Sequence, residues 1–214
     1  MFRKEVIVFD WDGTLADSGP AVFRAIRRLI EECQYPVLTE EQILQNLGLS
    51  MKDFARKMLK VDETELPLFL KRFYAFFEEE EKKSEILYPD AMETLNYFKQ
   101  NGYNLAIATN RIRERLNKAL QLTKLGDFFN YSVTADEALD KPKPLMMDFI
   151  LNAFGADKTD VWMIGDSIYD AAFANNAGVR CVIIDRNFYN QEVFSAYRDL
   201  KLLPNLKALI DEIK

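Results

Sequence analysis

The spacing of apolar residues divides this chain into three stretches. Val6–Phe9 is an unbroken apolar run rich in β-branched side chains, and such a run predicts a strand that is buried on both faces. From about residue 17 to residue 84, apolar positions recur at the three- and four-residue spacing of amphipathic helices. From residue 85 onward, short apolar runs alternate with segments of helical spacing. The middle stretch is therefore predicted to be all helical, within a chain that otherwise alternates strands and helices.

Helices in the middle stretch are predicted from their starting signals. Residues 17–20 (Asp-Ser-Gly-Pro) offer a cap and a first-turn proline, Thr39 with Gln42 resembles a capping box, and Ser50 suits a third cap. The expected helices span residues 21–33, 39–48, 50–60 and 63–83. The fourth carries a stripe of Phe and Leu, which we expect to pack against the other helices. Its end, the charged run at residues 78–83, is expected to be a solvated helix end that leads to a hinge.

The final stretch supplies further strands and helices in alternation. Strands are expected at residues 103–109, 131–134, 160–164 and 180–184, and helices at 89–101, 112–122, 144–154, 167–178 and after Pro204. This alternation requires a parallel sheet with right-handed crossovers and helices on both faces. We therefore predict an α/β fold. A doubly wound parallel sheet, or Rossmann-like core, is expected from residues 1–16 and 85–214, with an inserted all-helical cap domain at residues 17–84.

Polar side chains follow several of the predicted strands at their carboxyl ends. Asp10 and Asp12 follow the first strand, Thr109 and Asn110 end the second, and Asp166 follows a later one. In open parallel sheets, ligands bind in the crevice beyond the carboxyl ends of the strands. The sequence therefore predicts one composite site at this edge of the sheet.

Asp10 and Asp12 make a costly pair at the end of a buried strand, because two ionised carboxylates close together need a compensating cation. Mg²⁺ suits the pair, since it takes oxygen ligands and typically binds one or two carboxylates together with water and phosphate. Gly13 lets the chain turn sharply out of the strand. One carboxylate is a candidate nucleophile toward a phosphoryl group. Its neighbour is a candidate acid for the leaving alcohol and a candidate base for water.

A cation, a third carboxylate and hydrogen-bond donors complete the predicted site. Lys141, in the sequence Lys-Pro-x-Pro, is a stiffened cation that suits a phosphoryl group. Asp166 would complete the coordination of Mg²⁺, and Asp170, one helical turn on, is expected to orient Lys141 or the metal ligands. Thr109 and Asn110 are expected to donate hydrogen bonds to phosphoryl oxygens, where charge develops during transfer.

Composition narrows the classes of function. With 214 residues, 49% of them hydrophobic and 29% charged, the chain resembles an ordinary soluble globular protein. Its net charge of −6 argues against binding to nucleic acid or to an anionic membrane, and no apolar stretch approaches the length of a membrane span. The chain contains no His, which excludes Ser–His and Cys–His nucleophile pairs, His-ligated zinc and His bases.

Cysteine usage indicates the compartment. Cys33 and Cys181 are far apart and form no metal-binding or redox motif. Because the N-terminus shows no secretory leader, the simplest interpretation is two reduced thiols packed in a cytoplasmic protein. The apolar surface of the helical stretch suits either internal packing or an interface, so a monomer and a homodimer are both expected possibilities.

Four motifs, taken in order, resemble those of the haloacid dehalogenase superfamily of aspartate-nucleophile phosphotransferases. The first is Asp-x-Asp-Gly-Thr-Leu at residues 10–15, and the second is the strand that ends in Thr109. The third is Lys141, and the fourth is Gly-Asp-x-x-x-Asp at residues 165–170. The motifs span most of the chain, and the helical insert between the first two looks like a cap of the phosphoglycolate phosphatase type. The resemblance implies a hinged cap whose closure excludes water and selects the substrate.

The resemblance also implies a role for each motif residue. Asp10 would be the nucleophile and a Mg²⁺ ligand, and Asp12 would be the acid and base, with its backbone carbonyl on the metal. Thr109 and Lys141 would bind the phosphoryl group, and Asp166 would bind Mg²⁺. The dehalogenase branch keeps no second aspartate at the position of Asp12, so this residue favours phosphate esters as substrates.

Substrate contacts are expected from Gly13, Asn110 and Arg111. Arg111 replaces the Lys that phosphoglycolate-type relatives frequently carry after Thr-Asn. We hypothesise that its fork of donors binds the phosphate or a carboxylate of the substrate. The alternative is a surface residue at the start of a helix. Residues 48–50 occupy the place of a specificity loop in relatives.

These residues together predict a Mg²⁺-dependent phosphatase that hydrolyses a small phosphorylated metabolite through an aspartyl-phosphate. Phosphoglycolate, sugar phosphates and nucleotides all suit such a site. The alternative is a phosphomutase like β-phosphoglucomutase, although such relatives use a cap His that this chain lacks. A third possibility, a non-catalytic binding protein on the same fold, is disfavoured by the complete set of site residues.

Overall fold

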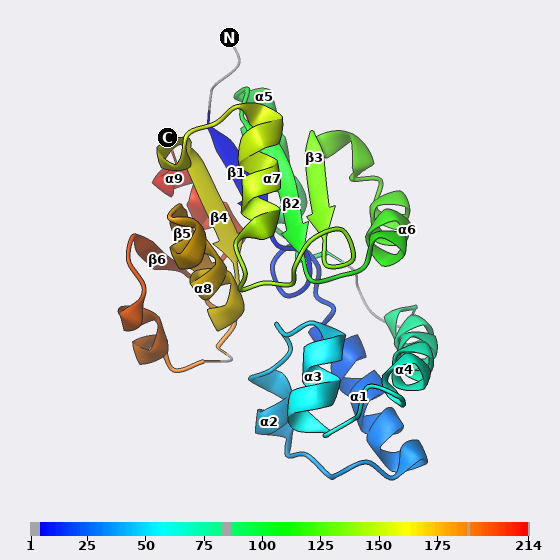
Figure 1. Ribbon diagram of the computed structural model, residues 1–214. Coiled ribbons are helices and arrows are strands. Elements are labelled where there is room, and N and C mark those ends of the chain that lie inside the picture. Colours follow the sequence, from blue (N-terminus) through cyan, green and yellow to red (C-terminus); the bar gives the residue numbers. More distant parts are fainter. Residues whose placement is uncertain (1–4, 83–86, 188, 214) are drawn as a thin grey trace.

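A central parallel sheet organises the protein. The computed structural model describes residues 5–82, 87–187 and 189–213. Within these residues, six parallel strands pair in the order β3-β2-β1-β4-β5-β6 (Figure 1). The strands are β1 (Val6–Phe9), β2 (Asn104–Thr109), β3 (Tyr131–Thr134), β4 (Val161–Gly165), β5 (Arg180–Ile184) and β6 (Leu200–Leu203). The predicted α/β fold with a doubly wound parallel sheet is confirmed.

Helices cover both faces of this sheet. They are α5 (Ala91–Gln100), α6 (Arg113–Thr123), α7 (Leu145–Phe154), α8 (Ile168–Ala177) and α9 (Leu209–Glu212). Short 3₁₀ turns accompany them at η1 (Gly126–Phe128), η2 (Lys158–Asp160), η3 (Gln191–Ala196) and η4 (Leu206–Ala208). Each helix in the described part of the chain falls short of the length and apolarity needed to cross a lipid bilayer.

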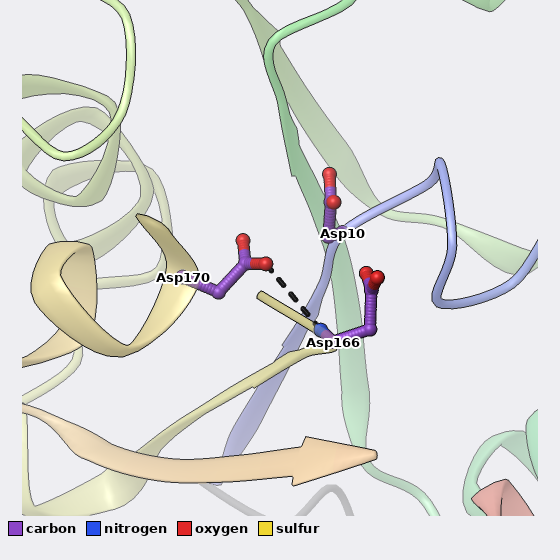
Figure 2. A group of neighbouring side chains, drawn as sticks. All are labelled: Asp10, Asp166 and Asp170. Atoms are coloured by element: carbon purple, nitrogen blue, oxygen red, sulfur yellow. Dashed lines mark hydrogen bonds between the residues drawn. The ribbon is translucent and has the colours of Figure 1, made fainter. Parts of the chain in front are cut away.

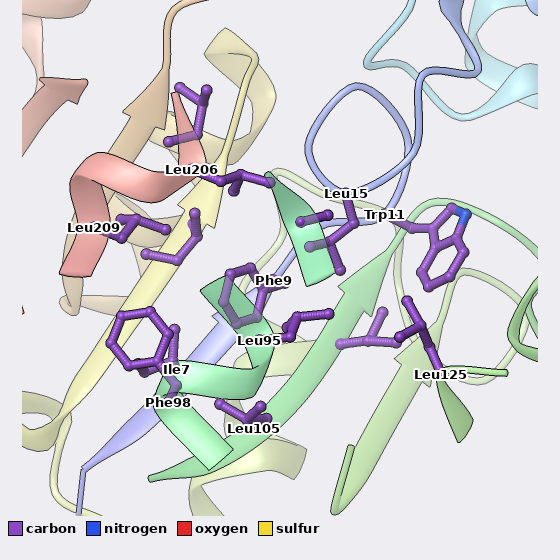
Figure 3. Packing of buried hydrophobic residues seen from close by; sticks show 14 of the residues in the cluster. Ile7, Phe9, Trp11, Leu15, Leu95, Phe98, Leu105, Leu125, Leu206 and Leu209 are labelled. Carbon is purple, nitrogen blue, oxygen red and sulfur yellow. The ribbon is translucent and has the colours of Figure 1, made fainter. Parts of the chain in front are cut away.

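The two faces of β1 belong to two different apolar clusters. Ile7 and Phe9 pack with residues of α5, α6 and α9, and Figure 3 shows Phe9 beside Leu95 in this cluster. Val8 packs on the opposite face with residues of α7 and α8. Because successive side chains of a strand point to opposite faces, an unbroken apolar run can fill both clusters. This explains why β1 carries no polar position before Asp10.

The four helices between β1 and β2 form a separate body with its own core. They are α1 (Gly19–Cys33), α2 (Glu40–Leu44), α3 (Met51–Met58) and α4 (Leu66–Glu81). Their buried residues, among them Ile26, Phe54 and Phe69, form a third cluster distinct from those of the sheet. Figure 1 shows these helices beyond the sheet, at the end where β1 leads into α1. We refer to residues 19–81 as the helical insert.

Local signals located most helix starts correctly. The Thr39 side chain accepts a hydrogen bond from the Gln42 backbone N–H in a capping box, and Ser50 accepts one from Asp53. The predicted helix start at residues 17–20 is confirmed, with a proline in the first turn of α1, but Ser18 at the N-cap position makes no capping hydrogen bond with its side chain. Its hydroxyl instead donates to the Asp12 carboxylate, which draws this residue into the site.

The C-terminal region differs from the prediction. The strand β6 was not expected, because its sequence Leu-Lys-Leu-Leu lacks β-branched residues and gives no strand signal. It pairs with β5 at the edge of the sheet. The helix expected after Pro204 is a 3₁₀ turn followed by the short α9. The predicted domain boundary at residues 84/85 and the helix end at Lys83 lie outside the described residues.

Candidate active site

Three carboxylates converge at the carboxyl edge of the sheet. Asp10 follows β1, Asp166 follows the neighbouring strand β4, and Asp170 lies in the first turn of α8. One oxygen from each lies within 4.8 Å of the others, and the three side chains gather in Figure 2. All three are buried. The parallel pairing of β1 with β4 thus brings together residues that are 156 positions apart in the sequence.

The loop after β1 is shaped to bring these carboxylates close. Gly13 has a φ of +80°, and a Cβ on it would lie 2.3 Å from an Asp166 oxygen, so only glycine fits. The Thr14 hydroxyl donates to Asp166 at 2.9 Å. Arg186, just after β5, donates to the carbonyls of Gly13 and Thr14 at 3.0 Å. The sequence analysis named neither Thr14 nor Arg186 as a site residue. Arg186 could have been recognised from its position just beyond the carboxyl end of a predicted strand.

Lys141 is a buried cation between two of the carboxylates. Its Nζ lies 2.8 Å from Asp10 Oδ1 and 2.6 Å from Asp170 Oδ1, with 2% of the side chain exposed. Burial by itself lowers the pKa of Lys141, but the charges of Asp10 and Asp170 raise it above its usual value. The amine therefore stays charged. Its backbone N–H donates to the Asn110 side chain at 2.9 Å, which ties the Lys141 loop to the end of β2.

Asp170 orients its neighbours through both of its oxygens. One oxygen accepts from Lys141, and the other accepts from the hydroxyl of Ser167 at 2.6 Å and from its backbone N–H at 3.2 Å. The same pair forms the capping box of α8. The Asp170 carboxylate thus caps the helix and also contacts Lys141 in the site. The sequence suggested that Asp170 orients Lys141 or the metal ligands, and this contact matches the first of the two.

The electrostatics of the carboxylates indicate a place for a cation. Burial, followed by the partly offsetting charge of Lys141 and the repulsion of Asp170, raises the pKa of Asp10 to about 7. Burial, Asp170 and Asp10 raise the pKa of Asp166 well above its usual value. A divalent cation would relieve this repulsion, and a set of carboxylate oxygens suits a hard ion such as Mg²⁺. The donor set of this site therefore fits the predicted metal.

Asp12 lies apart from the three carboxylates and is paired with Arg111. The guanidinium contacts both Asp12 oxygens, with Nε at 2.8 Å and Nη2 at 2.6 Å, and the Ser18 hydroxyl donates at 2.5 Å. Burial raises the pKa of Asp12, but the charge and hydrogen bonds of Arg111 and Ser18 together hold that pKa below its usual value. The Asp12 carboxylate is therefore ionised in this arrangement.

Arg111 itself is neither on the surface nor free for a ligand. Only 7% of the residue is exposed, which contradicts the alternative of a surface residue at a helix start. Its Nη1 pairs with Glu81 of α4 at 3.2 Å, and its guanidinium lies 5.4 Å from the Phe77 ring. The side chain thus joins Asp12 to the helical insert.

The end of β2 also enters the site. Thr109 is 1% exposed and lines the cavity above the carboxylates, with its oxygen accepting from the backbone N–H of Arg111 at 3.1 Å. The Asn110 side chain donates to the carbonyl of Gly48 in the insert at 3.1 Å. Asn110 therefore links the insert to the sheet as well as to Lys141.

The charged run at the end of α4 is a helix end, as predicted, but it is solvated only in part: Glu79 and Lys82 are exposed, whereas other members of the run contact the sheet side. Glu78 pairs with Arg115 and Lys118 of α6, and Glu81 pairs with Arg111. Glu80 is 8% exposed. Sequence alone could not show these partners, because their proximity depends on how α4 is placed beside α6.

The sequence also carries the pattern of a known family over most of its length. The family described as haloacid dehalogenase-like hydrolase matches residues 7–184, which include the carboxylates of the site together with Thr109 and Lys141. The chain belongs to this family. Membership confirms the prediction that the protein is an enzyme and a hydrolase.

Curated relatives cover nearly the whole chain. A protein named phosphoglycolate phosphatase 1 from Pseudomonas aeruginosa is 26% identical over 213 residues, which are 96% of this chain and 78% of the relative. A pyrophosphatase named PpaX from Bacillus velezensis is 26% identical over 209 residues, covering 97% and 95% of the two chains. Both relatives are named as enzymes that act on phosphate compounds.

Solved structures show the same fold. A haloacid dehalogenase-like hydrolase from Bacteroides fragilis superposes with a TM-score of 0.88 at 25% identity, covering 97% of this chain and all of the other. CbbY from Rhodobacter sphaeroides, determined in complex with phosphate, superposes with a TM-score of 0.81 at 20% identity and covers 96% of each chain. Both structures thus share the fold of this chain.

Proposed function

We propose that the protein is a Mg²⁺-dependent phosphatase that hydrolyses a small phosphorylated metabolite through an aspartyl-phosphate. The observation that carries the proposal is the buried cluster of Asp10, Asp166 and Asp170 at the carboxyl edge of the sheet, with the Lys141 amine against Asp10 and Asp170. The family match and the phosphatase names of its relatives support it.

Residues of this chain would hold the metal and the phosphoryl group together. The carboxylates of Asp10 and Asp166 and the backbone carbonyl of Asp12 would bind Mg²⁺, which would neutralise charge on the phosphoryl oxygens. The Lys141 amine, already against Asp10, and the Thr109 hydroxyl would bind the remaining phosphoryl oxygens. Preorganised positive charge of this kind is usually the largest contribution to such a reaction.

The reaction proceeds in two displacements at phosphorus. An oxygen of Asp10 attacks the phosphorus atom, the bond to the leaving alcohol breaks, and Asp12 gives that oxygen a proton. In the second step Asp12 takes a proton from water, whose oxygen attacks the phosphorus and releases Asp10 and inorganic phosphate. The double use of Asp12 requires it to alternate between protonated and ionised forms.

Arg111 favours one of these two forms. Its contact with both Asp12 oxygens holds that carboxylate ionised, which is the form that activates water. Protonation of the leaving group requires Asp12 to gain a proton, which the negative charge of a bound phosphoryl group would favour. In this proposal Arg111 acts on Asp12, in place of the substrate contact that the sequence suggested.

Phosphate release tests the proposal. We expect turnover of p-nitrophenyl phosphate with Mg²⁺, loss of turnover when EDTA removes the metal, and at least a thousandfold loss in Asp10→Asn. Asp148 is an exposed carboxylate on α7, outside the site, so Asp148→Asn is the control for the same Asp-to-Asn change and should retain activity. Equal turnover by Asp10→Asn and the parent would contradict the nucleophile assignment. Isomerisation of a sugar phosphate without phosphate release would favour a mutase instead.

A further inference from the structure

A cavity lies between the carboxyl edge of the sheet and the helical insert. Residues at the sheet edge form one side of it, including Asp10, Asp12, Thr109 and Asp166. The insert forms the other side with apolar side chains, including those of Val22, Leu44, Leu47, Met51, Phe73 and Phe77. A phosphoryl group bound at Asp10 would direct the rest of its molecule into this space. The apolar side therefore faces the alcohol portion of any phosphate ester.

The cations of the cavity are already paired. Among the described residues that line it, the cationic side chains are Arg111 and Arg115, both from the sheet side. Arg111 is shared between Asp12 and Glu81. Arg115 contacts Glu78 at 3.3 Å and the Tyr74 carbonyl at 3.2 Å. The insert thus contributes carboxylates beside these arginines, and it contributes no cation to the described lining.

This lining discriminates among phosphate compounds by charge. A second anionic group, such as the carboxylate of phosphoglycolate or the second phosphate of pyrophosphate, would have to leave water for an apolar surface. Without an available cation, this desolvation is unfavourable. An uncharged apolar group in the same place gains about fourfold in binding for each methylene that it buries.

We propose that the cavity selects phosphate monoesters whose alcohol portion is uncharged and apolar or aromatic. This inference rests on the proposed phosphatase function and deepens it, because it names the class of substrate at the same site. It also separates this chain from its relatives named for phosphoglycolate and pyrophosphate. The specificity arises from residues of α1, the α2–α3 region and α4.

A series of primary alkyl phosphates tests the inference. Ethyl, butyl and 2-phenylethyl phosphate and 2-phosphoglycolate all lose a primary alcohol, so they differ mainly in the group that enters the cavity. We expect kcat/KM to rise at least tenfold from ethyl to 2-phenylethyl phosphate, and phosphoglycolate to fall below ethyl phosphate. Phosphoglycolate turnover equal to or above that of 2-phenylethyl phosphate would overturn the inference.

Binding of non-hydrolysable phosphonates separates this inference from the proposed function. Calorimetric titration with Mg²⁺ present compares 3-phenylpropylphosphonate with 4-phosphonobutyrate, which carries a carboxylate in place of the ring. We expect at least tenfold tighter binding of the phenyl compound. If no ester is hydrolysed, the phosphatase proposal fails. The relative affinity for the two phosphonates still shows whether the cavity prefers an apolar or an anionic group. Equal affinity, or tighter binding of the carboxylate compound, would overturn the inference.

A cation placed on the apolar side should reverse the selection. Leu47 lines the cavity and is partly buried, so Leu47→Arg adds a guanidinium there, and Leu47→Gln is the uncharged polar control. We expect Leu47→Arg to raise the ratio of phosphoglycolate to 2-phenylethyl phosphate kcat/KM at least tenfold more than Leu47→Gln does. Circular dichroism and Tm identify any loss of folding. Equal ratios of kcat/KM in the two variants, both folded, would contradict the conclusion that the apolar side of the cavity faces the alcohol portion of the substrate.

Discussion

The guanidinium of Arg111 is the centre of the charge network that joins the sheet to the helical insert. It contacts both oxygens of Asp12, pairs with Glu81 and lies over the Phe77 ring. A planar fork of donors matches a carboxylate in a way that a lysine amine does not. Because the Asp12 carboxylate is held at both oxygens, Arg111 determines the direction in which that carboxylate points.

Removing this fork should affect turnover more than substrate binding. We expect Arg111→Ala to lower kcat about ten- to hundredfold, because small misplacement of a reacting group has effects of this size. KM should change less than kcat. Arg111→Lys keeps the charge but not the fork of donors, so its kcat should lie between that of the parent and that of Arg111→Ala. Steady-state kinetics on the best substrate measure both constants.

Glu81→Gln is the control for this prediction. It removes the charge of Glu81 and leaves the contact between Arg111 and Asp12 in place, so most of kcat should be retained. A kcat/KM for Arg111→Ala equal to that of the parent, on every good substrate, would rule out the positioning role.

The two cysteines should differ in reactivity. Burial raises the pKa of the Cys181 thiol well above its usual value, and the nearby Asp170 acts in the same direction. A raised pKa keeps the thiol protonated, and only the thiolate reacts, so raising the pH to about 9 should not expose Cys181 to reagents. Cys33 is partly exposed.

We therefore expect one thiol of the native protein to react with a chromogenic disulfide reagent at pH 8, and the second to react only after unfolding. The reactive thiol should disappear in Cys33→Ser. Two thiols that react at the same rate in the folded protein would contradict the buried position of Cys181.

At the scale of elements, the loop between α2 and α3 contacts the sheet side through residue Gly48. The Gly48 carbonyl accepts from Asn110, and a Cβ on Gly48 would lie 2.7 Å from the Ser167 hydroxyl and 2.8 Å from the Tyr169 ring. Glycine is common where a backbone approaches other groups so closely that no side chain would fit. The loop therefore fits against α8 only without a side chain.

Gly48→Ala should push this loop away from α8 and loosen the cavity wall that it carries. We expect kcat/KM to fall about tenfold, because substrate positioning depends on how closely the insert approaches the sheet. Gly126→Ala is the matched control, since a Cβ there meets nothing within 4 Å. Identical kcat/KM values for the two variants would show that the contact has no functional consequence.

At the scale of the whole molecule, the metal site that we propose at these carboxylates should couple metal binding to stability. Buried carboxylates that repel one another favour unfolding unless a cation is bound. A ligand that binds only the folded state at about a hundred times its Kd adds about 2.7 kcal/mol to the free energy of unfolding. For a chain of this size, this corresponds to a rise in Tm of about 5–10 °C.

We therefore expect Mg²⁺ to raise the Tm in calorimetry, and Asp166→Asn to remove most of that increase. Asp148→Asn, which changes an exposed carboxylate outside the site, should respond as the parent does. A Tm that is insensitive to Mg²⁺ in the parent protein, over millimolar concentrations, would contradict a metal site at these carboxylates.

The sequence predicted the composite site well, because its residues follow strands whose apolar pattern is strong. Once β1, β2 and β4 are recognised as buried parallel strands, Asp10, Thr109 and Asp166 must lie at the same edge. The strand β6 escaped notice because its four residues lie at the sheet edge, where half-buried positions leave little pattern. Short edge strands form through pairing with a neighbour rather than through their own propensity.

The chain by itself determined the alternation of strands and helices, the helical insert and the set of carboxylates, since these depend on local spacing and on one rule of parallel sheets. Only the tertiary structure decided how Arg111 pairs with Asp12 and Glu81, and how Glu78 meets Arg115. Charged side chains carry no directional pattern in a sequence, so their partners emerge only when separate elements pack together. The charge of the cavity, and with it the class of substrate that we infer, follows from that packing.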